Sequence, residues 1–164
     1  MDDAPTGVQK KFLAEADHPG RLCLLIAKDL RTGLDRDFAP FGLTGQQAAV
    51  LMHCIRLKGT GPSRLASEVG TDTAGITGLI DQLEKKGLVK REANSEDRRA
   101  VNVEPTPAGR ALAPRLRFAF RQFATGCLRG FSTEEAEKLV KLLGRLQNNA
   151  KELLGESRGK EVVR

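Results

Sequence analysis

Four consecutive charged residues occupy the middle of the segment NSEDRRAV, residues 94–101, and they are Glu96, Asp97, Arg98 and Arg99. Short runs with strand character flank them, LVKRE at residues 88–92 and AVNVE at residues 100–104. The pattern predicts a β-hairpin with the charges at its tip. Arginines in such a place can bind an anion, and an acid beside them can orient one of them through a charge-assisted hydrogen bond. On its own, however, a charged run of this kind is usually a solvated turn.

The bulk composition is that of a globular chain with a moderate excess of positive charge. Its 164 residues are enough for one domain, or for one compact unit with a dimerisation part. Lys and Arg outnumber Asp and Glu by 27 to 21, which permits nucleic-acid binding without requiring it. The acidic start MDDAPTG lacks the apolar core of a signal peptide, and no stretch of about 18 apolar residues is present to span a membrane.

Few residues in the chain are suited to metal binding or catalysis. Three widely spaced cysteines, Cys23, Cys54 and Cys127, argue against a disulfide framework and favour a reducing cytoplasm. His18 and His53 are the only histidines, and CxxC, HExxH and GxxxxGKS/T motifs are absent. We find no nucleophile–base pair and no metal cluster in the sequence. We therefore expect no enzymatic activity, no metal and no cofactor.

Helical periodicity precedes the charged segment. Between residues 21 and 38, apolar side chains recur every four positions and form one helix face. These side chains are Leu22, Ile26, Leu30 and Leu34. Thr44 and Gln47 have the spacing of a capping box that starts a second helix. Pro62 suits the first turn of a third helix, and Gly70 ends it.

A fourth helix is predicted directly before the hairpin, with Thr71 or Asp72 as its N-cap and Gly87 at its end. Its inward stripe is apolar at helical spacing, and consists of Ile76, Leu79, Ile80 and Leu83. Its outward face is small and polar, and consists of Thr73, Ala74, Thr77, Gly78, Asp81 and Gln82. Two helices joined by a tight turn at Gly70, with a hairpin after them, form the pattern of a winged helix-turn-helix.

Two further helices follow the hairpin. Thr106 and Pro107 open the first, and Pro114 inside it predicts a kink. A second capping box starts the last helix, whose apolar residues recur in steps of three and four, as in a heptad seam. These are Ala136, Leu139, Leu143, Leu146, Ala150 and Leu153. A three-helix winged lobe alone cannot bury this seam together with the apolar face of residues 21–38, so we expect a homodimer.

The segment LEKKGLVKREANSEDRRAVNVEPTPAG, residues 83–109, resembles the MarR family of winged-helix transcriptional regulators in the order and spacing of its motifs. LTGQQAAVL at residues 43–51 and SRLASEVG at residues 63–70 are similar to the second and third helices of that family. The resemblance covers about residues 20–155. It implies a mainly α fold with a small β-hairpin wing and an obligate homodimer on a palindromic operator in double-stranded DNA. In the family, a small lipophilic ligand or oxidation of a cysteine releases the DNA.

The resemblance also suggests how the chain is divided. We expect a flexible N-terminal arm, a helical dimerisation region in two segments, a winged helix-turn-helix DNA-binding lobe and a frayed tail. Their bounds are residues 1–19 for the arm, 20–43 and 107–155 for the dimerisation region, 44–106 for the lobe and 156–164 for the tail. The alternative for the lobe is a module that binds protein, against which the basic wing argues.

The wing residues that match the family's Asp-x-Arg pair are Asp97 and Arg99. The resemblance implies that Arg99 enters a narrow minor groove, where the negative potential is strong, and that Asp97 orients it. Arg98 can contact phosphate. On and just after the fourth helix, the candidates for DNA contact are Thr73, Thr77, Gly78, Gln82 and Lys86. The alternative for these residues is an ordinary exposed helix face, and Gly78 departs from the basic or larger polar residue common in the family.

Two readings of the effector remain open. RLCLLIA, residues 21–27, resembles the first helix of the organic-hydroperoxide branch of the family, which makes Cys23, with Cys127 of a partner subunit, a candidate redox pair. The tyrosines that hold the sensor cysteine in that branch are missing, because the chain has no tyrosine, and buried packing is the alternative. His53 is a candidate to pair with a ligand carboxylate, or else an ordinary satisfied histidine. We expect a small lipophilic or aromatic acid, rather than peroxide, to be the effector, and we expect Cys54 to be buried.

Overall fold

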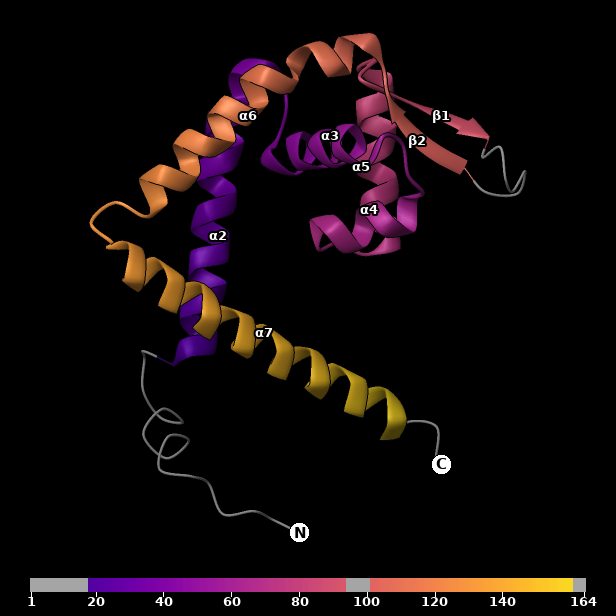
Figure 1. Ribbon diagram of the computed structural model, residues 1–164. Helices are drawn as coiled ribbons and strands as arrows, with labels where there is room; N and C mark the ends of the chain where they lie inside the picture. Colours follow the sequence, from indigo (N-terminus) through magenta and orange to yellow (C-terminus); the bar gives the residue numbers. More distant parts are fainter. Residues whose placement is uncertain (1–17, 94–100, 161–164) are drawn as a thin grey trace. The chain divides into compact units, whose positions relative to one another are not determined.

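The computed structural model describes residues 18–93 and 101–160, with side chains up to residue 155. The elements in these ranges follow the order α2 (Pro19–Phe38), η1 (Ala39–Phe41), α3 (Gly45–Leu57), α4 (Pro62–Val69), α5 (Thr73–Lys85), β1 (Val89–Ala93), β2 (Val101–Pro105), α6 (Pro107–Cys127) and α7 (Thr133–Lys160). Figure 1 shows their path. The mainly helical fold with a two-stranded hairpin is confirmed. Most of the expected N-terminal arm and the whole wing tip, residues 94–100, lie outside the described residues.

The chain divides into two compact units, Met1–Phe123 and Ala124–Arg164. The first contains α2, the winged lobe and most of α6, and the second contains the end of α6 and α7. The expected division by function, in which α2 and all of α6 belong with the last helix to a dimerisation region, stays a prediction. Within the first unit, Phe38 of α2 and Leu116 of α6 are both fully buried with the core of the lobe.

Local signals in the sequence explain where the helices of the first unit begin and end. The capping box at Thr44 and Gln47 starts α3, with both reciprocal hydrogen bonds present. Pro62 occupies the first turn of α4, and Gly70 ends it with a left-handed backbone of φ 72°. Of the two candidate N-caps for α5, Asp72 is the one used, and its carboxylate accepts from the backbone N–H of Gly75 at 2.7 Å.

The core of the first unit lies between the helix-turn-helix and the hairpin. It contains fully buried side chains from α3, α4, α5, α6 and β2, among them Leu51, Leu65, Ile76, Ile80, Leu83, Val103 and Leu116. The strands pair antiparallel, with Val89 opposite Pro105 and Ala93 opposite Val101. Thr60, in the loop after α3, exchanges two backbone hydrogen bonds with Val103 of β2. The base of the wing is therefore tied to the loop between α3 and α4.

The TPAG segment joins the start of α6 to the end of α5. The backbone N–H of Thr106 donates to the carbonyl oxygen of Leu88 at 3.1 Å. The hydroxyl of Thr106 donates to the carbonyl oxygen of Gly87 at 2.7 Å and accepts from the N–H of Gly109 at 3.1 Å. A Cβ atom on Gly109 would lie 2.2 Å from the carbonyl oxygen of Leu88. Only glycine permits the backbone at residue 109 to come this close to Leu88. The close contact places α6 directly against the segment that leads into the wing.

In the second unit, the expected capping box starts α7. The N–H of Ser132 donates to Oε2 of Glu135 at 2.8 Å, and the N–H of Glu135 donates to Oγ of Ser132 at 3.2 Å. We expected this helix to end near residue 155 and residues 156–164 to fray. In the structure α7 extends to Lys160, and fraying of this tail stays a prediction. Pro114 lies inside α6, as expected.

The Gly109 contact leads to a stability prediction. Gly109→Ala should lower the free energy of unfolding by about 1–3 kcal/mol, the scale of an overpacked core site, because the new methyl group meets a backbone carbonyl that Thr106 holds in place. Gly78→Ala is the matched control, since a Cβ there meets no described atom within 4 Å. It should raise stability by about 0.5–1 kcal/mol through helix propensity. Urea unfolding followed by circular dichroism measures both, and equal stability of Gly109→Ala and wild type would contradict the contact.

Candidate DNA-binding surface

The outward face of α5 is fixed by what the helix buries on its other side. Ile76, Ile80 and Leu83 are fully buried in the core, so the helix cannot rotate without exposing them. Thr73 and Thr77 are exposed on the opposite face, and Gly78 is half-buried. Because α5 follows α4 through the tight turn at Gly70, this face is presented as in a helix-turn-helix.

The hydroxyl of Thr77 is used within the helix. Its Oγ1 donates to the carbonyl oxygen of Thr73, one turn earlier, at 2.8 Å. This backward hydrogen bond is a common alternative for threonine inside a helix. In this rotamer Thr77 offers a partner its methyl group and an oxygen that can only accept a hydrogen bond.

Gln82 and Lys86, two of the residues predicted to contact DNA, converge on Gln47 at the start of α3. Nε2 of Gln47 donates to Oε1 of Gln82 at 2.5 Å. Nζ of Lys86 donates to Oε1 of Gln47 at 3.1 Å and also to the carbonyl oxygen of Gly42. Gln47 itself is only 4% exposed. From the sequence we recognised Gln47 only as the partner of Thr44 in the capping box, and no local pattern indicated its contacts with α5.

Arg91 ties the first strand of the wing to α5. Its guanidinium donates to Asp81 at 2.5 Å and also pairs with Glu84, and its backbone N–H donates to Oε1 of Glu84 at 3.0 Å. The hydrogen bond with Asp81 is the main cause that raises the pKa of Arg91. Lys90 pairs with Glu92 on the same strand. Asp81, which we expected on the outward face, is therefore half-buried and pairs with the wing.

The wing tip carries the remaining predicted DNA contacts, and Asp97, Arg98 and Arg99 all lie outside the described residues. The described part of the hairpin ends at the pair Ala93 and Val101.

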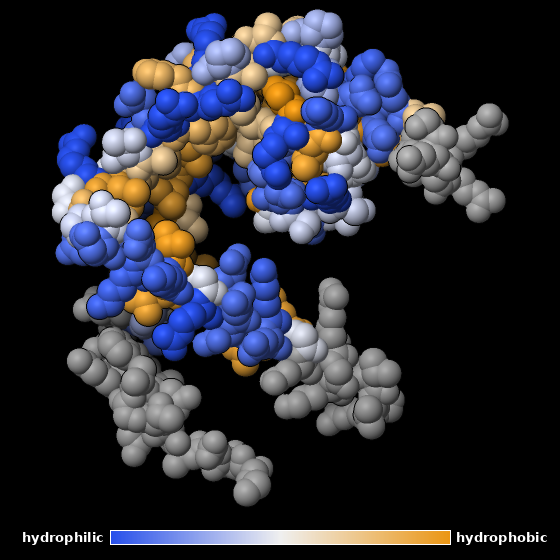
Figure 2. Space-filling view, in the orientation of Figure 1, coloured by the Kyte–Doolittle hydropathy of each residue, from blue (hydrophilic) through white to orange (hydrophobic). Residues whose placement is uncertain are grey.

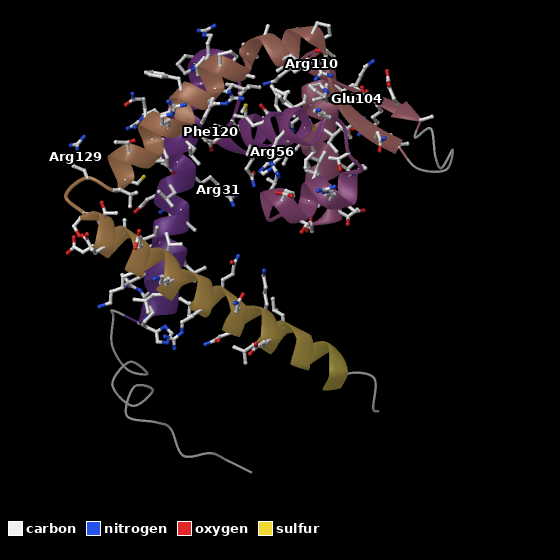
Figure 3. All side chains as sticks on the ribbon, viewed as in Figure 1. Arg31, Arg56, Glu104, Arg110, Phe120 and Arg129 are labelled. Atoms are coloured by element: carbon white, nitrogen blue, oxygen red, sulfur yellow. The ribbon has the colours of Figure 1, made fainter. Side chains whose placement is uncertain are left out.

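A pocket of about 470 Å³ lies within the first unit, between α3 and α6. Its lining is mostly apolar with three nitrogen-bearing side chains, and consists of Ala49, Met52, His53, Ile55, Arg56, Arg117 and Phe120. Figure 3 shows that Arg56 comes from α3 and Phe120 from α6. Nδ1 of His53 lies 3.2 Å from Nη2 of Arg56, and the same Nη2 donates to Oε2 of Glu68 on α4 at 2.6 Å. The sequence indicated His53 but not the two arginines, which come from different helices.

The three cysteines have different surroundings. Cys54 is fully buried, as expected, and burial raises the pKa of its thiol to about 12. It therefore stays a neutral, weakly reactive thiol at physiological pH. Cys23 is half-buried on α2, and Cys127 is exposed at the end of α6. Among the described residues, no group of three or more His, Cys, Asp or Glu side chains is placed to hold a metal ion.

A helix-turn-helix with a small polar outward face, followed directly by an antiparallel hairpin, defines the class of winged helix-turn-helix DNA-binding proteins. The family model described as the MarR family matches residues 43–101. A crystal structure of a probable transcriptional regulator from Pseudomonas aeruginosa is 31% identical, over 74% of this chain and 94% of that chain, with a TM-score of 0.65. The chain belongs to the MarR family and is a DNA-binding transcriptional regulator.

Other solved structures have the same fold. The reduced form of MarR from E. coli is 25% identical, over 77% of this chain and 94% of that chain, with a TM-score of 0.65. BpsR from Bordetella bronchiseptica is 22% identical, over 88% of this chain and 98% of that chain, with a TM-score of 0.73. Its structure is described as explaining the regulation of its DNA binding by 6-hydroxynicotinic acid. In the part of this chain that the structure describes, none of the helices is long and apolar enough to cross a membrane.

Proposed function

We propose that this regulator acts as a homodimeric repressor on a palindromic operator in double-stranded DNA. A small lipophilic or aromatic acid releases it from the operator. The observation that carries the proposal is the surface of α5, where the buried stripe of Ile76, Ile80 and Leu83 holds a small polar face outward. Two such faces, related by the dimer axis, fit two half-sites whose centres lie about one helical turn, roughly 10 bp, apart.

DNA binding by the wing gives the first prediction. Arg99→Ala should weaken operator binding by about 1–3 kcal/mol, the scale of a lost specific contact. Arg98→Ala is the matched control, because a lost phosphate contact weakens binding to all sequences alike and lowers the salt slope by about one. Fluorescence anisotropy on a selected operator and a scrambled duplex, at several salt concentrations, measures both. If Arg99→Ala binds the operator as tightly as wild type, the wing has no role in recognition.

Dimerisation is supported by apolar faces that each unit leaves exposed. On α7, Leu143 and Leu153 are 45% and 66% exposed. On α2, Leu22 and Ile26 are 40% and 51% exposed. Figure 2 shows apolar surface along α6 and, in the second unit, in patches along α7. Contiguous apolar faces of this kind usually mark an interaction site, and the heptad spacing on α7 suits a second helix.

Sedimentation velocity at low micromolar concentration should therefore show a dimer of the 17.8 kDa chain. Replacing Leu143 and Leu146 with glutamate should shift the population toward monomer, because it places charges inside the seam. The same two replacements at Lys138 and Lys141, which lie outside the seam, should leave the dimer intact. A wild-type protein that sediments only as a 17.8 kDa species would exclude the homodimer.

The effector proposal is supported by the pocket between α3 and α6. Its apolar lining suits an aromatic ring, and the guanidinium groups of Arg56 and Arg117 suit a carboxylate. BpsR, which has the same fold, is regulated by an aromatic acid. Such a ligand binds more tightly to a dimer conformation in which the distance between the two lobes does not match successive major grooves, and this releases the DNA. The ligand can shift the equilibrium between the DNA-binding and the released conformation only as far as its affinities for the two conformations differ.

A thermal-shift screen of aromatic acids, beginning with 6-hydroxynicotinic acid, tests the pocket. A carboxylate ligand should raise the apparent melting temperature and release operator DNA, and its uncharged amide should do neither. Arg117→Met should abolish both effects while keeping the apolar stem of the side chain.

Treatment with an organic hydroperoxide tests the alternative to the ligand, which is redox sensing through Cys23. We expect it to leave operator binding unchanged in wild type and in Cys23→Ser. Release of wild type by equimolar peroxide, absent in Cys23→Ser and reversed by a thiol reductant, would replace the ligand proposal with redox sensing through Cys23.

A further inference from the structure

The buried side chain of Gln47 has only one possible amide orientation. Its Oε1 lies 3.1 Å from the backbone nitrogen of Thr44 and 3.1 Å from Nζ of Lys86. A backbone N–H and an ammonium group can only donate hydrogen bonds, so the atom between them must be an acceptor. The other terminal atom of Gln47, which points to α5, is therefore the NH₂ group.

This orientation determines that of Gln82. Because Gln47 presents an N–H donor, the atom of Gln82 that faces it must be the carbonyl oxygen, and the two lie 2.5 Å apart. The NH₂ group of Gln82 is then the terminus that does not face Gln47. Gln82 lies on the exposed face of α5, so a side chain that in general can donate or accept is here set to donate.

We propose that Gln47 is a specificity-determining positioning residue, which fixes the amide of Gln82 so that it presents hydrogen-bond donors to the operator. The proposal rests on the DNA binding proposed above and adds which base edge Gln82 selects. A bidentate contact with adenine needs both Oε1 and Nε2 of a glutamine directed at the base. With Oε1 turned to Gln47, Gln82 instead favours a base rich in major-groove acceptors, guanine through O6 and N7 or thymine through O4.

The variant that tests this inference is Gln47→Glu. A carboxylate still accepts from Thr44, since glutamate is itself a usual third residue of the capping box, and it still accepts from Lys86. It cannot donate to Gln82. The amide of Gln82 must therefore turn over, donate its NH₂ group to the new carboxylate and leave Oε1 facing outward.

The first measurement is selection of binding sites by the full-length wild-type dimer from a library of duplexes with a randomised central segment. Competition with single-base variants of the selected site then gives the base preference at each position, for wild type and for Gln47→Glu. At one symmetric pair of positions, wild type should prefer guanine or thymine over cytosine by about three- to tenfold, the range of one net hydrogen bond. Gln47→Glu should shift that preference toward cytosine or adenine, whose amino groups donate.

Two further variants separate the effect of the Gln82 amide orientation from the effect of the negative charge that Gln47→Glu introduces. Gln82→Met removes the amide and should reduce the preference at that position alone. The double variant with Gln47→Glu and Gln82→Met should have the same base preference as Gln82→Met, although the added negative charge weakens its binding to all sequences. Thermal unfolding of Gln47→Glu should match wild type to within a few degrees, because the capping box and the Lys86 contact remain.

The results separate failure of sequence-specific DNA binding from failure of the role proposed for Gln47. If no site is enriched from the library, sequence-specific DNA binding fails, and the inference fails with it. If wild type selects a site but Gln47→Glu weakens all single-base variants equally, DNA binding stands and the role of Gln47 is overturned. A base shift that persists in the double variant would overturn it as well, because the shift would then not depend on Gln82.

Discussion

The close approach of α6 to the end of α5 is the constraint on which the rest of the first unit depends. The carbonyl oxygen of Leu88 accepts from the N–H of Thr106 and lies where a Cβ atom on Gly109 would have to be. At this point α5 has just ended, the wing begins and α6 starts. The three elements therefore meet at one junction, held by backbone contacts and by the hydroxyl of Thr106.

Two basic residues at the end of α5 and on β1 make their hydrogen bonds and ion pairs within the lobe. Lys86 holds η1 and α3 through Gly42 and Gln47, and Arg91 holds the first wing strand to Asp81 and Glu84. The hydrogen bonds of both groups are directed inward. Part of the positive charge of the lobe is thus compensated by its own carboxylates, Asp81 and Glu84.

The elements and the outline of the site follow from the sequence because their signals are local. The capping residues Thr44 and Ser132, Pro62 and the apolar stripe of α5 indicated the helices within a residue or two. The contacts of Gln47 and the arginines of the pocket could not be predicted, since they join residues 35 or more positions apart along the chain or on separate helices. A long polar side chain is compatible with solvent at almost any exposed position, so helix periodicity alone cannot identify its partner. Asp81 illustrates this limit, because its spacing indicates an exposed residue and its partner, Arg91, lies on the wing.

The ion pair between Arg56 and Glu68 competes with any anion that would bind Arg56 in the pocket. Glu68 is a carboxylate carried by α4, and it already occupies one of the guanidinium groups that an entering anion would use. A small inorganic anion exchanges one such contact for another and gains little. An anion that also covers Met52 and Phe120 adds apolar burial to the exchange. Apolar burial therefore favours an aromatic acid over a small inorganic anion at the site proposed for the effector.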